Sequence, residues 1–369
     1  MIYRDLGRTG YRVSQLGFGA MRLPTVGEGE SASVDREKAL PMIHRAFQAG
    51  VNYIDTAVGY CNQDSQRAVG EALKGWRDKI VVSTKNPEYD DEAKWWQNLE
   101  NSLERLQVDY IDIYNHHGIN WESWVERVEP KASVWMRRAH DQGLIKHVCV
   151  SFHDSNESLV KLVDTGYPES ITLQYNMLDQ SLEQGIAHAH ERGVGIVVMG
   201  PVAGGRLGAS SEVLEELVPG IKRVPELALR FVLANPNISL ALSGMSAMEQ
   251  VEENLVVAAH VVSLSDEEKE AIAAHLRRLQ GMADLYCTGC NYCQPCPQEV
   301  NIPYVFKKYN EGRVYGLWEP AQKAYRGWRW VEGKNAEACT ECGECEDKCP
   351  QHIAIRDQLK EAHEALTRG

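Results

Sequence analysis

Short apolar stretches alternate with segments of helical spacing along the front part of this chain, and this alternation limits its fold more than any other feature. Eight strand-like stretches occur between residues 14 and 259, each followed by a helical segment: SQLGFGA, VNYIDT, KIVVSTK, YIDIYNHH, IKHVCVSF, SITLQYN, VGIVVMG and ISLALSG. Strict alternation of strands and helices predicts a parallel sheet. Eight units over roughly 250 residues match the size and strand number of a (β/α)₈ barrel, so we predict an α/β protein built on a TIM barrel.

A doubly wound open sheet is the main alternative for the same alternation. Eight strands would be many for such a sheet, and its first strand is usually followed by a G-x-G-x-x-G turn. The corresponding stretch here reads GFGAMR, which lacks that spacing. The barrel therefore remains the preferred prediction.

Polar side chains follow three neighbouring strands of the predicted barrel. Asp55 and Tyr60 come just after the second strand, and Lys85 ends the third. The fourth strand ends at His116 and His117. Residues just past the carboxyl ends of barrel strands face the active site, so these groups are expected to converge.

This set of side chains suits the reduction of a carbonyl group. Tyr60 could give a proton to the oxygen while a hydride reaches the carbon, but a free tyrosine, with a pKa of about 10, is a weak acid for this task. We expect the ammonium of Lys85 to lower the pKa of Tyr60, Asp55 to keep Lys85 charged, and a histidine to orient the carbonyl. Taken singly, the same residues could be a helix cap, a surface charge or a satisfied polar group.

Four stretches resemble signature segments of the aldo-keto reductase family: NYIDTAVGY, VVSTK, SLERLQVDYIDIYNHH and SGMSAMEQVEENL. The resemblance runs through roughly residues 1–260. His117 is preferred to His116 because family members read D-[LI]-Y-x-x-H at this point. The resemblance implies the barrel, NAD(P)H as cofactor without metal or flavin, and a catalytic tetrad of Asp55, Tyr60, Lys85 and His117.

The same resemblance implies residues that contact the nicotinamide cofactor, and several depart from the family's pattern. Phe152 stands where the family has Asn, and Met199 where it has a Tyr that stacks on the nicotinamide. Ser246 and Gln250 stand where Arg or Lys often holds the 2′-phosphate of NADP, so the choice between NAD and NADP stays open. The cofactor contacts predicted on this basis are Met21, Ser151, Gln174, Met199, Gly200, Pro201, Ser246, Gln250, Glu253 and Asn254.

Eight of the ten cysteines fall in two runs, CTGCNYCQPCP from residue 287 and CTECGECEDKCP from residue 339. The second run has the spacing of bacterial ferredoxins, which bind [4Fe–4S] clusters, and in two-cluster ferredoxins the fourth cysteine ligates the other cluster. A Cys₄ zinc site is the alternative, but it needs neither a third cysteine at this spacing nor a fourth before proline. We predict two [4Fe–4S] clusters, one on Cys287, Cys290, Cys293 and Cys349 and the other on Cys339, Cys342, Cys345 and Cys296.

The region around these cysteines is predicted to be a small, mainly helical domain that resembles a dicluster ferredoxin. Residues 297–338 separate the two runs and form a helical, aromatic insert longer than that of compact ferredoxins. We place the domain boundary near residue 281. This gives an aldo-keto reductase-like barrel with a linking helix over 1–280 and a ferredoxin-like domain over 281–369.

Charge and hydropathy argue against several classes of partner. The net charge is −13 and no basic block occurs, which argues against nucleic acid and anionic membranes. The N-terminus lacks the apolar core of a signal peptide, and no run is long enough to span a bilayer, so we expect a cytoplasmic protein. A reducing compartment disfavours interpreting the cysteines as disulfides.

The two predicted domains carry different redox chemistry. A nicotinamide transfers two electrons as hydride and a [4Fe–4S] cluster transfers one, and no residues indicate a flavin between them. We therefore predict an NAD(P)H-linked enzyme for a small carbonyl or alcohol substrate, with clusters that stabilise the C-terminal fold or serve an external one-electron redox protein. Two alternatives stay open: an electron-transfer iron-sulfur protein whose barrel is a scaffold, and an enzyme that reduces its substrate with cluster electrons.

Overall fold

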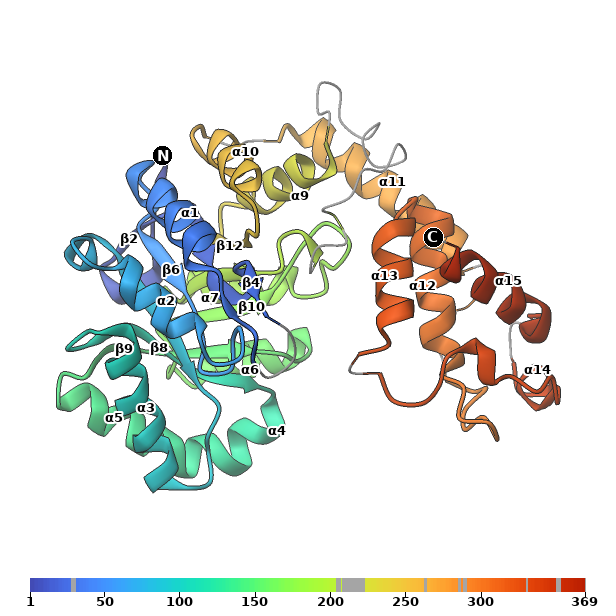
Figure 1. The fold of residues 1–369 in the computed structure, drawn as a ribbon, viewed down its shortest axis with the longest axis horizontal. Coiled ribbons are helices and arrows are strands. Elements are labelled where there is room, and N and C mark those ends of the chain that lie inside the picture. The colour runs from blue at the N-terminus through green and yellow to red at the C-terminus, as the bar shows by residue number, and fades with distance from the viewer. Residues whose placement is uncertain are drawn as a thin grey trace. The chain divides into compact units, whose positions relative to one another are not determined.

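Eight parallel strands close into a barrel in the computed structural model (Figure 1). The structure describes residues 1–27, 31–203, 207, 223–261, 264–284, 287, 291–329, 331–349 and 353–368. The chain divides into two compact units. The barrel unit comprises Met1–Ala203 and Ala228–Ser263, and the helical unit comprises Gly204–Leu227 and Leu264–Gly369.

The strands follow one another around the barrel in the order β10-β11-β12-β3-β6-β7-β8-β9, and each neighbouring pair is parallel. This closed parallel sheet confirms the predicted fold class. The strands are β3 (Leu16–Gly19), β6 (Tyr53–Asp55), β7 (Val81–Asn86), β8 (Ile111–Ile119), β9 (Ile145–Phe152), β10 (Ser170–Gln174), β11 (Gly195–Met199) and β12 (Leu240–Gly244).

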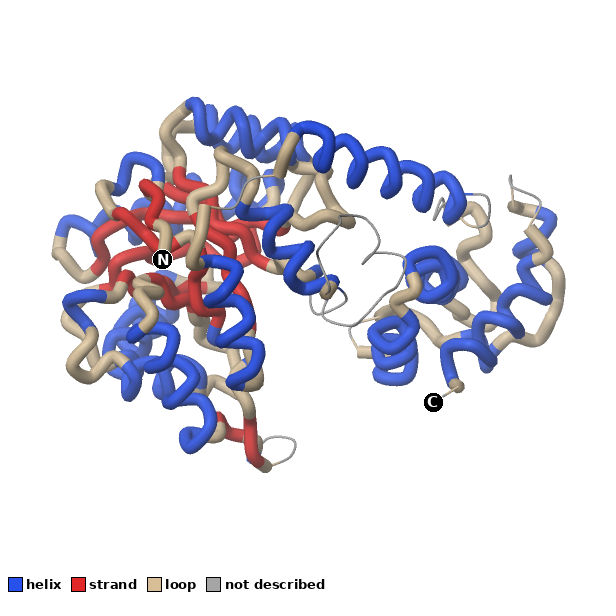
Figure 2. The backbone as a smooth tube through the Cα atoms, turned by 90° about the horizontal axis from the view of Figure 1, so that it is seen from above, coloured by secondary structure: helices blue, strands red, loops and turns tan. Residues whose placement is uncertain are grey.

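Helices surround the strands of the barrel unit, as Figure 2 shows. The helix α1 begins after Asp35, whose side chain accepts a hydrogen bond from the backbone N–H of Lys38 and so caps the helix. The segment after β8 includes a π-helical stretch, Trp124–Ala132. The helices in this part of the chain are α1 (Arg36–Gln48), α2 (Ser65–Ala72), α3 (Glu92–Leu106), α4 (Trp121–Ser123), α5 (Ser133–Asp141), α6 (Asn156–Asp164), α7 (Glu183–Glu191), α9 (Val224–Leu233) and α10 (Met248–Ala258).

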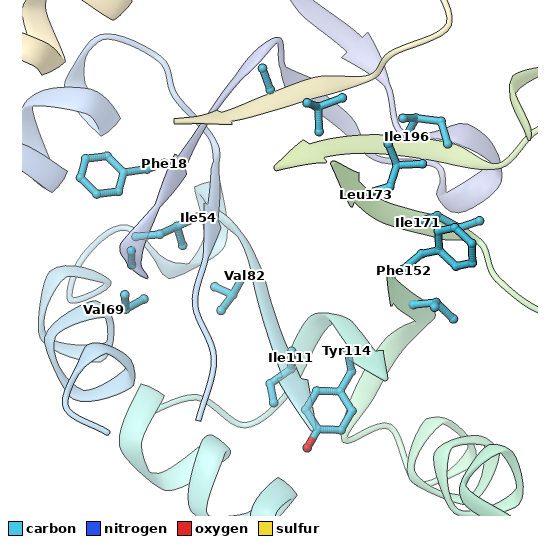
Figure 3. Packing of buried hydrophobic residues seen from close by; sticks show 14 of the residues in the cluster. Phe18, Ile54, Val69, Val82, Ile111, Tyr114, Phe152, Ile171, Leu173 and Ile196 are labelled. Carbon is cyan, nitrogen blue, oxygen red and sulfur yellow. The ribbon is translucent and has the colours of Figure 1, made fainter. Parts of the chain in front are cut away.

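Residues that point outward from the strands form the main hydrophobic core beneath these helices (Figure 3). Ile54 and Val82 on neighbouring strands belong to it, as do Phe152, Ile171 and Ile196 further around the barrel. Alternate strand residues face opposite sides of a sheet, so this outer core fixes which residues point inward.

The inward-pointing side chains change from apolar to polar along the barrel axis. Val81, Ile113 and Cys149 belong to a separate buried apolar cluster inside the barrel. Two residues further along the same strands stand Ser83, Asn115 and Ser151, all buried. The polar candidates for catalysis follow at the carboxyl ends, so the polar half of the interior lies next to them.

An N-terminal hairpin, which the sequence did not predict, packs against the amino end of the barrel. Its strands β1 (Tyr3–Asp5) and β2 (Arg12–Ser14) pair antiparallel, and Leu6 between them belongs to the interior apolar cluster. Gly7 and Gly195 make the close approach possible. A Cβ atom on Gly7, whose φ is +51°, would lie 2.2 Å from the backbone nitrogen of Gly195.

The helical unit has its own core. Phe306, Tyr325 and Leu359 belong to it, together with Cys293 and Cys349. This helical content agrees with the predicted nature of the insert, while the predicted domain boundary, which falls within α11, stays a prediction. No described helix is both long and apolar enough to cross a membrane. The helices are α11 (Asp266–Asp284), α12 (Ile302–Tyr315), α13 (Trp318–Gly327), α14 (Glu344–Asp347) and α15 (Ile355–Thr367).

Candidate active site

A buried ion pair joins the carboxyl ends of β6 and β7. The Nζ atom of Lys85 lies 2.5 Å from Oδ2 of Asp55, and the two residues are only 1% and 4% exposed. Lys85 also donates to the backbone carbonyl of Thr56 at 2.8 Å, and the hydroxyl of Ser83 donates to Oδ1 of Asp55 at 2.8 Å. The amide of Asn115 donates in turn to Ser83 at 3.2 Å. The network therefore fixes both charges of the pair.

Tyr60 and His117 lie beside this ion pair. The Nζ atom of Lys85 is 5.1 Å from the centroid of the Tyr60 ring. The rings of Tyr60 and His117 meet edge to face with centroids 6.2 Å apart. The structure thus brings together the phenol, the ammonium, the carboxylate and the imidazole that the sequence singled out.

The expected pKa of Tyr60 needs correction. Burial raises the pKa of Tyr60, and the charge of Lys85 and its hydrogen bond to Tyr60 do not compensate, so the phenol is held protonated. Burial also acts to lower the pKa of Lys85, but Asp55 and Tyr60 outweigh it and raise that pKa overall. Lys85 therefore stays an ammonium and Tyr60 a proton donor.

The two neighbouring histidines have different surroundings. His117 is kept neutral, because burial and the charges of Lys85 and His153 lower its pKa to about 4. Its backbone carbonyl accepts a hydrogen bond from the hydroxyl of Tyr89. His116 is fully buried, and its Nε2 lies 2.8 Å from the hydroxyl of Tyr167. Tyr167 packs against the outer core, so the His116 ring points away from the barrel interior.

A left-handed turn follows Tyr60, and sequence reasoning missed it. Cys61, Asn62 and Gln63 have φ values of 50°, 55° and 67°, a conformation that costs residues other than glycine roughly 1–2 kcal/mol each. Three residues outside the turn form hydrogen bonds with its side chains and hold it in place. Cys61 Sγ donates to the carbonyl of Met21 at 3.5 Å, Asn62 Nδ2 to that of Ala32 at 3.3 Å, and Arg105 to the side-chain oxygen of Gln63 at 3.4 Å.

Three of the predicted nicotinamide contacts lie at neighbouring strand ends. Ser151 on β9 is 1% exposed, and its hydroxyl has no hydrogen-bond partner among the described residues. Gln174 and Met199 face each other in the β10–β11 register, the first exposed and the second half-buried. An unpaired buried hydroxyl and an exposed amide on neighbouring strands fit a ligand with hydrogen-bonding groups, such as a carboxamide. Met21 is 58% exposed, and Gly200 and Pro201 follow β11 directly.

The residues predicted for the adenosine end lie on α10 and just before it, and two of them are hydrogen-bonded to each other. The backbone N–H of Ser246 donates to Oε1 of Gln250 at 2.8 Å, and Nδ2 of Asn254 donates to the hydroxyl of Ser243 at 2.9 Å. Glu253 lies on the same helix. The side chain of Arg22, a cationic residue that the sequence did not single out, packs against Gly244 at the end of β12.

The cysteines of the helical unit surround an opening of about 380 Å³, part of it open to solvent. Five cysteines line it: Cys293, Cys296, Cys339, Cys342 and Cys345. Cys342 is exposed, whereas Cys349 and Cys293 are both buried in the core of this unit. Cys287 is half-buried, and Cys290 lies outside the described residues. No three His, Cys, Asp or Glu side chains of the described chain gather closely enough to hold a single metal ion.

Two family models match the chain, one after the other along the sequence. The sequence model of the aldo/keto reductase family matches residues 15–277, and that of a 4Fe-4S dicluster domain matches residues 286–354. Together the matches cover the barrel strands and both cysteine runs.

Individual relatives resemble the barrel portion. The uncharacterized oxidoreductase YqkF of Bacillus subtilis is 28% identical over 311 residues, 74% of this chain and 96% of the relative. The NADH-specific methylglyoxal reductase of Escherichia coli is 27% identical over 317 residues, 71% of this chain and 94% of the relative. The holo form of aldo-keto reductase AKR11C1 from Bacillus halodurans superposes with a TM-score of 0.64 and 29% identity, covering 74% of this chain and 96% of that structure.

Proposed function

The chain belongs to the aldo/keto reductase family and carries a 4Fe-4S dicluster domain, and from that premise we propose that it reduces an aldehyde or ketone, or oxidises the corresponding alcohol, with a nicotinamide cofactor. The observation that carries the proposal is the convergence of the Asp55–Lys85 ion pair with Tyr60 and His117 at one mouth of the barrel. A relative named an NADH-specific methylglyoxal reductase supports the same chemistry.

In this proposal Tyr60 is the proton donor. Its raised pKa keeps the hydroxyl protonated, so it can donate to the carbonyl oxygen while that oxygen gains negative charge. Neutral His117 donates a second hydrogen bond to the same oxygen and orients it. Two donors aimed at the position where charge develops stabilise the transition state more than the ground state.

Lys85 and Asp55 act on Tyr60 rather than on the substrate. The ammonium stabilises the phenolate that remains after the proton has left, because opposite charges attract strongly in a buried site. Asp55 and the carbonyl of Thr56 hold the ammonium in position. Both residues are therefore proposed as parts of the proton-transfer machinery.

The nicotinamide would lie against the ends of β9, β10 and β11. The unpaired hydroxyl of Ser151 and the exposed amide of Gln174 suit its carboxamide, and Met199 would pack against its ring. When bound, the reduced nicotinamide supplies the hydride that reaches the carbonyl carbon. We leave the nucleotide as NAD or NADP, with Met21, Gly200, Pro201, Ser246, Gln250, Glu253 and Asn254 as the remaining proposed contacts.

The test is a comparison of Tyr60→Phe with the unaltered protein. Removing the hydroxyl should lower kcat for NADH- or NADPH-linked reduction of short aldehydes by about a thousandfold, which is within the range of rate enhancement that one general acid contributes. Nucleotide binding should change little. Titration of tryptophan fluorescence with each nucleotide measures binding and also shows the preferred one. Nucleotide binding without any carbonyl reduction would favour the scaffold alternative.

We propose two [4Fe–4S] clusters in the helical unit. Four of the five cysteines that line one opening, Cys296, Cys339, Cys342 and Cys345, suit one cluster. Cys293, the fifth, would hold the other cluster together with Cys287, Cys290 and Cys349. The clusters would stabilise this unit or exchange single electrons with a partner protein, in a reducing compartment such as the cytoplasm.

Two measurements separate these roles. Anaerobically purified protein should contain about eight iron atoms per chain, and Cys342→Ala should remove about four of them. If the barrel chemistry is independent, NAD(P)H-linked turnover of Cys342→Ala should stay within about twofold of normal, the size of a minor perturbation. Turnover with a reduced viologen and none with nicotinamide would instead favour reduction by cluster electrons.

A further inference from the structure

His153 stands at the same mouth as the four proposed catalytic groups but has no part in their network. It follows Phe152, the last residue of β9, and its backbone N–H donates to the carbonyl of Ile119 at 2.8 Å. Ile119 is also paired with Phe152 in the β8–β9 ladder. The hydrogen bond therefore continues the ladder by one residue and keeps His153 in line with the strand.

The alternation along β9 directs the His153 side chain toward the barrel axis. Cys149 belongs to the apolar cluster inside the barrel, whereas Phe152 belongs to the outer core beneath the helices. Side chains of an extended strand point to opposite faces in turn, so Ser151 and His153 share the inner side with Cys149. His153 is exposed, which places its imidazole at the open end of this inner row.

His153 is close enough to the proposed catalytic groups to act on them electrostatically. Burial of part of the imidazole, and then the charge of Lys85, lower the pKa of His153, and His153 in turn contributes to the lowered pKa of His117. Asp154, the neighbouring carboxylate, accepts hydrogen bonds from the backbone N–H groups of Trp121 and Ser155 instead. The His153 ring forms no hydrogen bond within the described part of the chain.

The other proposed catalytic donors at this mouth of the barrel already have acceptors. In the proposed function Tyr60 and His117 both serve the reacting carbonyl oxygen, and Lys85 is held by Asp55 and Thr56. A neutral imidazole offers one further N–H donor. A simple ketone has no further oxygen to accept a hydrogen bond from that donor. A substrate that carries a second oxygen on the carbon adjacent to the carbonyl would provide one.

We propose that His153 is a specificity-determining residue that donates a hydrogen bond to an oxygen on the carbon adjacent to the reacting carbonyl, and so selects 1,2-dicarbonyl and 2-hydroxycarbonyl substrates. This inference rests on the proposed reductase function. It assigns the substrate class to a residue outside the four proposed catalytic groups. A side chain that cannot donate should weaken this selection without weakening reduction of a simple ketone.

The experiment compares 2,3-butanedione with 2-butanone, which has the same carbon chain but lacks the second oxygen. The ratio of kcat/KM for the two ketones is measured for the full-length protein and for His153→Phe, His153→Ala and His153→Gln. The intrinsic reactivities of the ketones cancel when ratios are compared between proteins. His140→Phe, at an exposed position on α5, is the matched control.

The ratio is expected to fall about tenfold in His153→Phe and His153→Ala, the size expected for one lost hydrogen bond. His153→Gln, which keeps a donor, should stay within about threefold of the original ratio, and His140→Phe should leave the ratio unchanged. His153→Ala decides the matter if the bulkier phenylalanine prevents folding.

Three outcomes would overturn the proposal. They are an unchanged ratio in His153→Ala, an equal loss of kcat/KM on both ketones, and a glutamine variant that behaves like alanine. Such results would leave the reductase function intact, because 2-butanone reduction would still depend on Tyr60. Absence of NAD(P)H-linked reduction of both ketones and of short aldehydes by the unaltered protein would instead reject the proposed function itself.

Discussion

The stability of the barrel unit should depend on the presence of both charges of its buried Asp55–Lys85 ion pair. Lys85→Met keeps the length of the side chain but leaves the carboxylate of Asp55, only 4% exposed, with the Ser83 hydroxyl as its remaining side-chain donor among the described residues. Breaking a buried pair by removing one partner costs about 3–5 kcal/mol, because an uncompensated charge stays buried. We expect Lys85→Met to lower the free energy of unfolding by that amount.

The double variant Asp55→Asn/Lys85→Met separates the charge from the packing. An amide of similar size needs no counter-charge, so the double variant should regain stability relative to Lys85→Met and lie within about 2 kcal/mol of the unaltered protein. Lys161→Met is the control. Lys161 and Glu157 lie 2.7 Å apart, but their side chains are 46% and 80% exposed, so that variant should lose less than about 1 kcal/mol.

Urea unfolding of the full-length protein at pH 7 measures these differences. Trp95 and Trp124 are buried in the barrel unit and should report its unfolding by fluorescence. A shift of the midpoint at constant slope gives the change in free energy. The reasoning would be refuted if Lys85→Met were as mild as Lys161→Met, or if the double variant lost the sum of the two single losses.

Three further predictions concern catalysis, cofactor binding and packing. Burial raises the pKa of Tyr60, so the rate of carbonyl reduction, which needs the protonated phenol, should stay level between about pH 6 and 9. The rate of alcohol oxidation, which needs the phenolate, should rise about tenfold per pH unit over the same range. An oxidation rate that levels off below about pH 8 would contradict this. Ser151→Ala should raise the Kd for the nicotinamide about five- to tenfold in a fluorescence titration, since one hydrogen bond is lost. Gly195→Ala should lower stability by about 1–3 kcal/mol in thermal unfolding, because its Cβ would lie 2.8 Å from the backbone carbon of Leu6. Gly327→Ala, with open space around the new Cβ, should lose less stability.

Much of the fold could be predicted because it depends on regular patterns. The eight strands and their following helices show in the sequence as alternating apolar stretches, and barrel closure follows from their number. Asp55 and Lys85 could be expected to meet because they end neighbouring strands. The β1–β2 hairpin could not, since strands of three residues show no periodicity and its position depends on Gly7 meeting Gly195, far away in the chain.

The features that sequence reasoning missed at the site depend on tertiary structure. The pKa of Tyr60 depends on how deeply the phenol is buried, which outweighs the Lys85 charge that the sequence does show. The left-handed turn at Cys61 is held by contacts from distant residues such as Arg105. Arg22 reaches Gly244 only because the barrel closes between β3 and β12. His153 was visible in the sequence, but its direction became clear only from the strand alternation.

The hairpin at the start of the chain has a practical consequence for handling the protein. Tyr3 donates to the carbonyl of Gly50 at 2.8 Å, in the turn that leads into β6, so the first residues are tied to the amino end of the barrel. The proposed mouth opens at the opposite end of the same strands. Attachment of a dye, a resin or an electrode through the N-terminus should therefore leave substrate entry to the barrel unobstructed.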